Sequence, residues 1–227
     1  IGDTLYATQT RFQNTSYASP RLELVTIKNG EVKLDKVQKF DGGWYTFMGG
    51  SDAYGPVIAS ISGFSGFRGD LIISRIINGE WVHEPIDALT AKPEVVFDKN
   101  GFLHATYTKQ NLADPNRDTI GYATNSPDGV WKAEVVGGEE HEKADAIFSS
   151  IAVDQGGAVH ISFKNYKDKF LMYKRRLPGA SWETFKIDGK GNPVYSRLKI
   201  DAQNRLHIAY EKSENIFYGA CEGCTIQ

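Results

Sequence analysis

The sequence is poor in the features that mark several common classes of protein. It has only two cysteines and two methionines among 227 residues, and its formal net charge of −2 corresponds to a pI near 6.2. Such a balanced charge provides no basic field for nucleic acid or anionic lipid, so we expect neither as a partner. No apolar run reaches the length of about 18 residues that a membrane-spanning helix requires, and we expect no transmembrane segment. The first residues are neither a methionine start nor a signal peptide, which we interpret as a processed or excised segment.

Residues that form turns and strands are abundant instead. The chain has 23 glycines and 12% aromatic residues, a composition that favours turns and strands over long helices. Three segments align without gaps, and each reads apolar strand, Asp, turn, apolar residue, His, two further residues, aromatic: 95–107, 151–163 and 198–210. This order predicts a β-hairpin in each segment. An aspartate begins each turn, and the glycine or asparagine that follows can take a positive φ: Asp98 and Gly101, Asp154 and Gly157, Asp201 and Asn204.

A second hairpin follows the first one in each repeat. Asn29-Gly30 and Asn78-Gly79 separate alternating apolar runs, which is a strong short-range hairpin signal. The repeating unit is therefore four antiparallel strands, named a to d, and it recurs at intervals of roughly 40–50 residues, as propeller blades do. The sequence predicts an all-β fold, a β-propeller of about five four-stranded antiparallel blades that form a single domain over residues 1–227. The expected blades cover residues 1–40, 48–88, 92–137, 149–188 and 195–227.

Two parts of the chain depart from this regular pattern. Residues 139–149 are the one stretch with a helical pattern, and we expect a short surface helix or a plain loop there. The first unit begins at strand b, and the last unit ends where strand d should begin. Three explanations stay open: thin terminal blades, residues 1–8 as the outer strand of the last blade, or a segment of a larger propeller.

The repeated order of residues resembles a known family. Apolar–Asp–turn–Gly–x–apolar–His–x–x–Tyr/Phe, followed by a tyrosine and a tryptophan, is similar to the BNR or Asp-box-like repeats of sialidase-type propellers, most clearly over residues 92–226. Residues 126–131, Ser-Pro-Asp-Gly-Val-Trp, resemble an Asp-box that is one residue short. The resemblance implies a propeller, an architecture that carries lectins, glycosidases, polysaccharide lyases and scaffolds. A sialidase would also show an arginine triad and a Tyr–Glu nucleophile pair, which no motif of this chain identifies.

Histidines occupy the same position of strand b in three units: His104, His160 and His207. They could bind a metal ion or a sugar only by converging at the axis of a propeller. A residue repeated in each unit more often makes the same inter-strand hydrogen bond each time, and we predict that structural role. The turn aspartates are predicted to cap their own backbone, because no bidentate glutamate follows Asp98 at the spacing of a calcium loop. We assign no metal ligand, no cofactor and no catalytic residue.

The candidate ligand-binding residues lie where the repeat is broken. Residues 63–70 replace the short turn between strands b and c of the second unit, and residues 109–118 lengthen the same connection in the third, so we expect both on one face. The first of these loops and the glycine-rich connection 40–47 offer aromatic rings for sugar stacking and a charged pair for hydroxyl or carboxylate groups. The predicted ligand-binding residues are Trp44, Phe64, Phe67, Arg68 and Asp70.

Tryptophans repeat at the start of strand d: Trp81, Trp131 and Trp182. We predict that they pack between blades. The alternative is a sugar-stacking platform between blades, because the flat apolar face of an indole suits a pyranose ring.

The two cysteines form a C-x-x-C motif, Cys221-Glu-Gly-Cys224. No histidine follows it as in a c-type haem site, no second pair completes a zinc site, and it does not begin a helix. A local disulfide in an exported protein is therefore predicted, and with it a secreted or periplasmic location.

Two functions from different classes compete. A non-catalytic, lectin-like carbohydrate-recognition module, our first hypothesis, predicts stacking aromatics and neutral polar groups. A glycosidase or lyase predicts two carboxylates, or a His–Tyr–Arg cluster, that converge in one pocket. A protein-interaction scaffold is a third alternative. The expected partner is a glycan or polysaccharide, and the oligomeric state is left open.

Overall fold

The computed structural model describes residues 3–11, 21–37, 42–65, 68–110, 118–137, 146–165, 168–189 and 191–221. These residues form seventeen strands and contain no helix, so the all-β prediction is confirmed for the described part of the chain. The chain divides into two compact units, Ile1–Val95 and Val96–Gln227. Each unit is described by itself.

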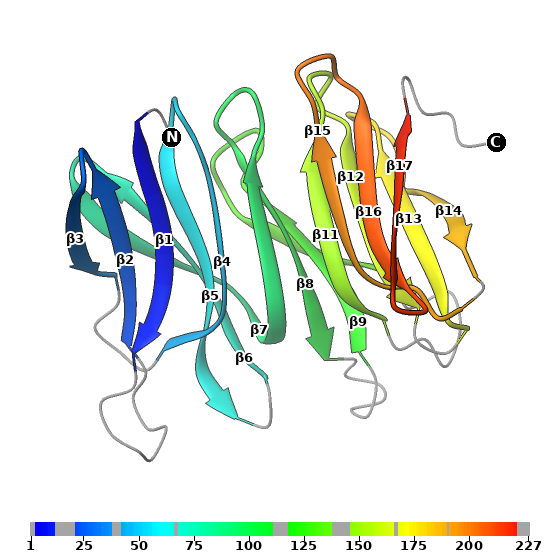
Figure 1. Ribbon diagram of the computed structural model, residues 1–227, viewed down its shortest axis with the longest axis horizontal. Coiled ribbons are helices and arrows are strands. Elements are labelled where there is room, and N and C mark those ends of the chain that lie inside the picture. The colour runs from blue at the N-terminus through cyan, green and yellow to red at the C-terminus, as the bar shows by residue number, and fades with distance from the viewer. Residues whose placement is uncertain are drawn as a thin grey trace. The chain divides into compact units, whose positions relative to one another are not determined.

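The first unit consists of antiparallel strands, with tight hairpin turns at Asn29-Gly30 and Asn78-Gly79 (Figure 1). One sheet has the order β1-β2-β3. The asparagine and the glycine of both predicted Asn-Gly turns have a positive φ, as a two-residue hairpin turn requires. The strands are β1 (Thr4–Arg11), β2 (Arg21–Lys28), β3 (Glu31–Lys36), β4 (Gly42–Ser51), β5 (Gly55–Ser65), β6 (Arg68–Ile77) and β7 (Glu80–Phe97). Its core joins the two sheets through Leu22, Leu24, Val37 and Ile58, against which Tyr6, Met48 and Trp81 pack.

The second unit follows the predicted a–b–c–d order closely (Figure 1). Its strands are β8 (Leu103–Gln110), β9 (Asp118–Thr124), β10 (Lys132–Gly137), β11 (Ala146–Val153), β12 (Val159–Asn165), β13 (Phe170–Arg176), β14 (Glu183–Asp188), β15 (Val194–Ile200), β16 (Leu206–Lys212) and β17 (Asn215–Cys221). Two sheets have the orders β11-β12-β13-β14 and β15-β16-β17. Residues 146–149 of the expected helix or loop lie in β11, and residues 139–145 lie outside the described residues.

The number of sheets differs from the number of expected blades. The described strands form four hydrogen-bonded sheets, and β7 continues without a break to Phe97. Within the units, the remaining strands run in the orders β7-β6-β5-β4 and β10-β9-β8. Residues 88–92, expected to connect two blades, are part of this strand. Leu89 and Lys92 adopt a positive φ there, which bends the strand without ending it. Ring closure and the single domain stay predictions.

The interior of the second unit is built mainly by residues of strands a, b and c, with Val136 from a strand d. One cluster comprises Ile120, Tyr122, Val136, Ile151, Val159, Ile161 and Phe163, and another comprises Ala152, Tyr173, Leu198 and Leu206. Every residue of β12 is buried, so this strand is covered on both faces. The buried tyrosines place their hydroxyls beside the repeated histidines, which brings the fold to the candidate site.

Candidate functional site

A hydrogen-bonded His–Tyr pair beside a turn aspartate occurs three times in the second unit, and only His207 also hydrogen-bonds its aspartate. The histidine Nδ1 and the tyrosine Oη, which belong to adjacent strands, are 2.7, 2.6 and 2.6 Å apart. The histidine Nε2 faces the aspartate Oδ2 at 3.6, 3.4 and 2.9 Å. The three sets are Asp98–His104–Tyr122, Asp154–His160–Tyr173 and Asp201–His207–Tyr218. The prediction that the repeated histidines make the same inter-strand hydrogen bond is therefore confirmed.

The other carboxylate oxygen of each aspartate caps its own turn. Asp98 Oδ1 accepts the backbone N–H of Asn100 at 2.8 Å and that of Phe102 at 2.9 Å. Asp154 and Asp201 accept equivalent backbone N–H groups. The residues predicted to take a positive φ do so: Gly101 (84°), Gly157 (84°) and Asn204 (61°). The capping prediction is also confirmed, and each aspartate joins the turn to the histidine.

Burial determines the protonation state of this arrangement. Burial lowers the pKa of His104 and of His160 from 6.5, although Asp98 and Asp154 oppose this shift. Burial also raises the pKa of Tyr122, and it raises that of Tyr173 to about 12. At neutral pH Tyr122 and Tyr173 therefore keep their protons and donate a hydrogen bond to Nδ1 of a neutral histidine, which leaves the ring proton on Nε2, on the side of the aspartate. Neither imidazole nitrogen faces the pocket as a free base.

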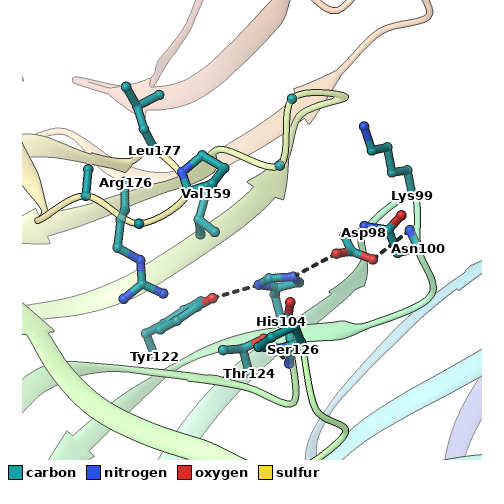
Figure 2. Close-up of a pocket in the computed structure, with 16 residues that line it drawn as sticks. Asp98, Lys99, Asn100, His104, Tyr122, Thr124, Ser126, Val159, Arg176 and Leu177 are labelled. Atoms are coloured by element: carbon teal, nitrogen blue, oxygen red, sulfur yellow. Dashed lines mark hydrogen bonds and ion pairs between the residues drawn. The ribbon is translucent and has the colours of Figure 1, made fainter.

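A cavity of 690 Å³ lies among the hairpin turns of the second unit, and we call it the hairpin-turn pocket (Figure 2). His104 and Tyr122 form part of its wall, and Figure 2 shows their contact and the contact of His104 with Asp98. The pocket combines charged, hydroxyl and apolar groups. Its lining residues are Asp98, Lys99, Asn100, His104, Tyr122, Thr124, Ser126, Pro127, Gly156, Gly157, Val159, Arg176, Leu177, Pro178, Gly179 and Ala180.

The repeat is broken at this pocket. Between the next two turns, Gln155 donates its backbone N–H to Asn204 Oδ1 at 2.8 Å, and its side-chain amide reaches the carbonyl of Ala202 at 3.3 Å. The residues in the positions of Gln155 and Asn204 at the pocket are Lys99 and Gly157. Gly157 has no side chain that could form this bridge, so the space between its turn and that of Lys99 stays open. Within the described part of the chain, Lys99 has no hydrogen bond or ion pair.

Arg176 gives the pocket a fixed positive charge. Its guanidinium lies 4.7 Å from the ring centroid of Tyr122 and 4.6 Å from that of Trp182, and its Nη1 contacts Glu134 Oε1 at 2.5 Å. The two rings also meet edge to face at 5.3 Å. Stacking between two aromatic rings orients the planar guanidinium. Trp182 and Trp81 each pack against a core cluster, which confirms the prediction of packing for these two tryptophans.

The structure corrects the expected surroundings of the predicted ligand residues. Trp44 belongs to β4 and not to a connection. Residues 63–65 and 68–70 belong to strands and not to a loop, because β5 and β6 pair as far as Ser65 and Arg68. Glycine permits this close approach, since a Cβ on Gly69 would lie 2.1 Å from the carbonyl oxygen of Ser62. Asp70 is exposed and Arg68 is half-buried in β6.

Several predicted contacts lie outside the described residues. They are the side chains of Trp44, Phe64 and Cys221, residues Phe67 and Cys224, and loop residues 111–117. The disulfide and the five ligand-binding residues therefore stay predictions. Lys99, Gly157 and Arg176 were missed as site residues. The alignment of the hairpins contains one signal for this site, because Gly157 stands where the last repeat has Asn204.

Comparison with known proteins addresses the fold. No protein-family model matches the chain, and no curated protein sequence matches it. A protein of unknown function from Dyadobacter fermentans has a TM-score of 0.65 and 12% identity over 92% of this chain and 71% of its own. The α-L-arabinanase of Penicillium chrysogenum, solved with arabinobiose, has a TM-score of 0.57 and 12% identity over 95% of this chain and 74% of its own.

The NanB sialidase of Streptococcus pneumoniae has a TM-score of 0.54 and 14% identity over 88% of this chain, which spans 34% of that enzyme. This chain has a propeller-type fold. In the described residues, no helix is long and apolar enough to cross a membrane. No group of three or more His, Cys, Asp or Glu side chains suited to a metal ion occurs among them either.

Proposed function

We propose that the protein is a non-catalytic carbohydrate-recognition module and that the hairpin-turn pocket is a glycan-binding site. The observation that carries the proposal is the loss of the Gln155–Asn204 bridge at this one position, which leaves a cavity of ligand size. Binding sites on repeat scaffolds lie where the repeat is locally broken. The similarity to an arabinanase solved with arabinobiose and to a sialidase supports a carbohydrate as the class of ligand.

The chemistry of the pocket suits a sugar. Lys99 and Asn100 offer donors from one turn, and Ser126 offers a hydroxyl from the turn that follows β9. Val159, Leu177, Pro127 and Pro178 supply apolar wall. A pyranose presents hydroxyls on its edge and C–H groups on its faces, so a mixed lining of this kind matches it.

An enzyme is the second candidate, and one observation favours it. His104, Tyr122 and Arg176 meet in the same pocket, which is the cluster expected of a polysaccharide lyase. The protonation of Tyr122 and the ion pair of Arg176 favour ligand recognition over catalysis. The raised pKa of Tyr122 opposes its use as a base, and Glu134 neutralises part of the charge of Arg176. The same His–Tyr contact at His160 and His207 indicates a scaffold role.

The variant Gly157→Asn tests the proposal directly. Asparagine occupies the equivalent position 204 with φ 61°, so the backbone tolerates it, and its side chain would bridge to the turn of Lys99. In a titration with an immobilised glycan panel, the parent is expected to bind, and Gly157→Asn is expected to bind at least about tenfold more weakly.

The matched control is Gly101→Asn, which makes the same change at the same φ of 84° in a residue that does not line the pocket. Equal binding by Gly157→Asn and the parent would exclude the pocket. Turnover of uronate-containing polysaccharide by the parent, lost in Tyr122→Phe, would establish the enzyme instead. Binding of other proteins but of no glycan would favour the scaffold.

The cellular location and the family are part of the same proposal. We propose a secreted or periplasmic member of the sialidase-type propeller superfamily with Asp-box-like repeats. The supporting features are the C-x-x-C motif of Cys221 and Cys224 and the repeated Asp–turn–His order. Two reactive thiols in protein isolated without reductant would contradict the exported, oxidised form.

A further inference from the structure

Two aromatic residues of the second unit have an unfavourable backbone conformation. Phe148 in β11 has φ 56°, and Tyr195 in β15 has φ 49°. Both lie at bulges in strand a, where the pairing register shifts between residues 147 and 150 and between residues 194 and 197. Glycine or asparagine is the ordinary occupant of a left-handed position, because a Cβ is strained there. The backbone therefore does not explain why these residues are aromatic.

The same backbone feature recurs in strands a of the first unit. Tyr45 in β4 has φ 44°, and Lys92 in β7 has φ 49°. Because the positive φ recurs in several strands, it is a feature of the fold. Its recurrence does not explain why aromatic side chains occupy these positions. Three of the four positions hold an aromatic residue followed by a hydroxyl residue: Tyr45-Thr46, Phe148-Ser149 and Tyr195-Ser196. Strained positions that keep a bulky side chain are a reason to suspect function.

The two rings of the second unit lie together at the surface. Their centroids are 4.4 Å apart with an interplanar angle of 50°, and Tyr195 is 57% exposed. The hydroxyls beside them are buried. Ser196 Oγ is 2.8 Å from Ser162 Oγ, whereas Ser149 Oγ has no hydrogen-bond partner among the described residues. The surface that a ligand could reach at this place is therefore aromatic, because both hydroxyls are buried.

The pair of rings is separate from the hairpin-turn pocket. Ile147 pairs with Lys164 near the end of β12, so the bulge of β11 lies toward the b–c connection. The pocket is lined instead by the a–b turn residues 156 and 157, at the other end of the same strand. A ligand at Phe148 and Tyr195 therefore does not occupy the pocket.

We propose that Phe148 and Tyr195 form a stacking platform for the apolar C–H face of a pyranose ring, a second carbohydrate contact of this chain. The proposal rests on the proposed function for its ligand class. An aromatic ring suits this face of a sugar, because C–H groups meet its electron-rich surface. One platform provides weak binding, with a Kd of roughly millimolar. Two such sites on one chain would raise the avidity for a polysaccharide.

Saturation-transfer NMR with methyl β-D-galactopyranoside and methyl β-D-glucopyranoside tests the platform. The parent and Tyr195→Phe are expected to transfer saturation to the sugar C–H protons, because both keep the ring. Tyr195→Gly and Phe148→Gly are expected to reduce this transfer by roughly threefold to tenfold. Glycine also relieves the positive φ, so the melting temperature of these variants is not expected to fall in parallel with binding.

Gly157→Asn separates the two sites. This variant is expected to leave unchanged the saturation transfer to methyl glycosides bound at Tyr195. Its effect on binding in the hairpin-turn pocket is independent of that result. Unchanged transfer in Tyr195→Gly, or no transfer to the parent at about 50 mM of either probe, would overturn the platform. If the parent binds panel glycans in a manner sensitive to Gly157→Asn while Tyr195→Gly has no effect, only the platform fails and the proposed function stands.

Discussion

His160 Nδ1 lies 2.6 Å from Tyr173 Oη, in a place where both side chains are almost fully buried. Removing the imidazole leaves the tyrosine hydroxyl buried without this partner. We expect His160→Ala to lower the free energy of unfolding by about 1–3 kcal/mol in urea denaturation. His207→Ala is the control, because its partner Tyr218 is 67% exposed and water can replace the lost contact. Equal losses in the two variants would contradict the assignment of a buried structural hydrogen bond.

Stability is expected to depend on pH through the buried histidines. The folded pKa of both His104 and His160 is lowered from 6.5 by burial, so the unfolded chain binds these protons more readily. Their contribution is therefore fully present above about pH 6.5 and is lost as the pH falls through the folded pKa. We expect the free energy of unfolding to decrease between about pH 7 and about pH 5. In the double variant His104→Asn/His160→Asn, the free energy of unfolding should depend less steeply on pH. A parent protein that becomes more stable on acidification would contradict the prediction.

The parts of the fold that depend on local chemistry were predictable from the sequence. The Asp98 turn, the positive φ of Gly101 and the His104 hydrogen bond all follow from residues close together in one hairpin, repeated three times. The continuity of β7 was not predictable, because Leu89 and Lys92 bend the strand through backbone conformations that neither residue type favours.

The candidate site was less predictable for a different reason. Glycine-rich runs resemble loops, yet Gly69 lies in β6, where the lack of a Cβ allows close contact with Ser62. The hairpin-turn pocket arises from the absence of a side chain at Gly157. The aligned repeats show glycine in the place of Asn204, but the bridge from Asn204 to Gln155 is visible only in three dimensions. Arg176 and Tyr122 are far apart in the sequence and meet through the packing of separate sheets.

Arg176→Lys is expected to destabilise the second unit although it keeps the charge. Lysine cannot stack a planar group between Tyr122 and Trp182, so both ring contacts are weakened. The expected loss is about 1 kcal/mol in urea denaturation followed by tryptophan fluorescence. Glu134→Gln keeps an oxygen acceptor beside Arg176 and is expected to change stability by less than about 0.5 kcal/mol. A larger effect of Glu134→Gln than of Arg176→Lys would show that the ion pair, and not the stacking, holds this cluster.

Gly121→Ala tests how closely the strands of the second unit pack. A Cβ at this position would lie 2.1 Å from Tyr107 Cε2, and the ring of Tyr107 is itself completely buried, so it has little room to move. Overpacking of a filled interior is expected to cost about 1–3 kcal/mol of unfolding free energy. Gly219→Ala provides the control, because its nearest neighbour would be a methyl group of Ile208 at 3.7 Å, an ordinary contact, and the change should stay within about 0.5 kcal/mol. Urea denaturation of both variants beside the parent measures the difference. If Gly121→Ala were as stable as Gly219→Ala, the ring of Tyr107 would have to shift to admit the new Cβ. The paired strands β8 and β9 would then be packed less tightly than the structure implies.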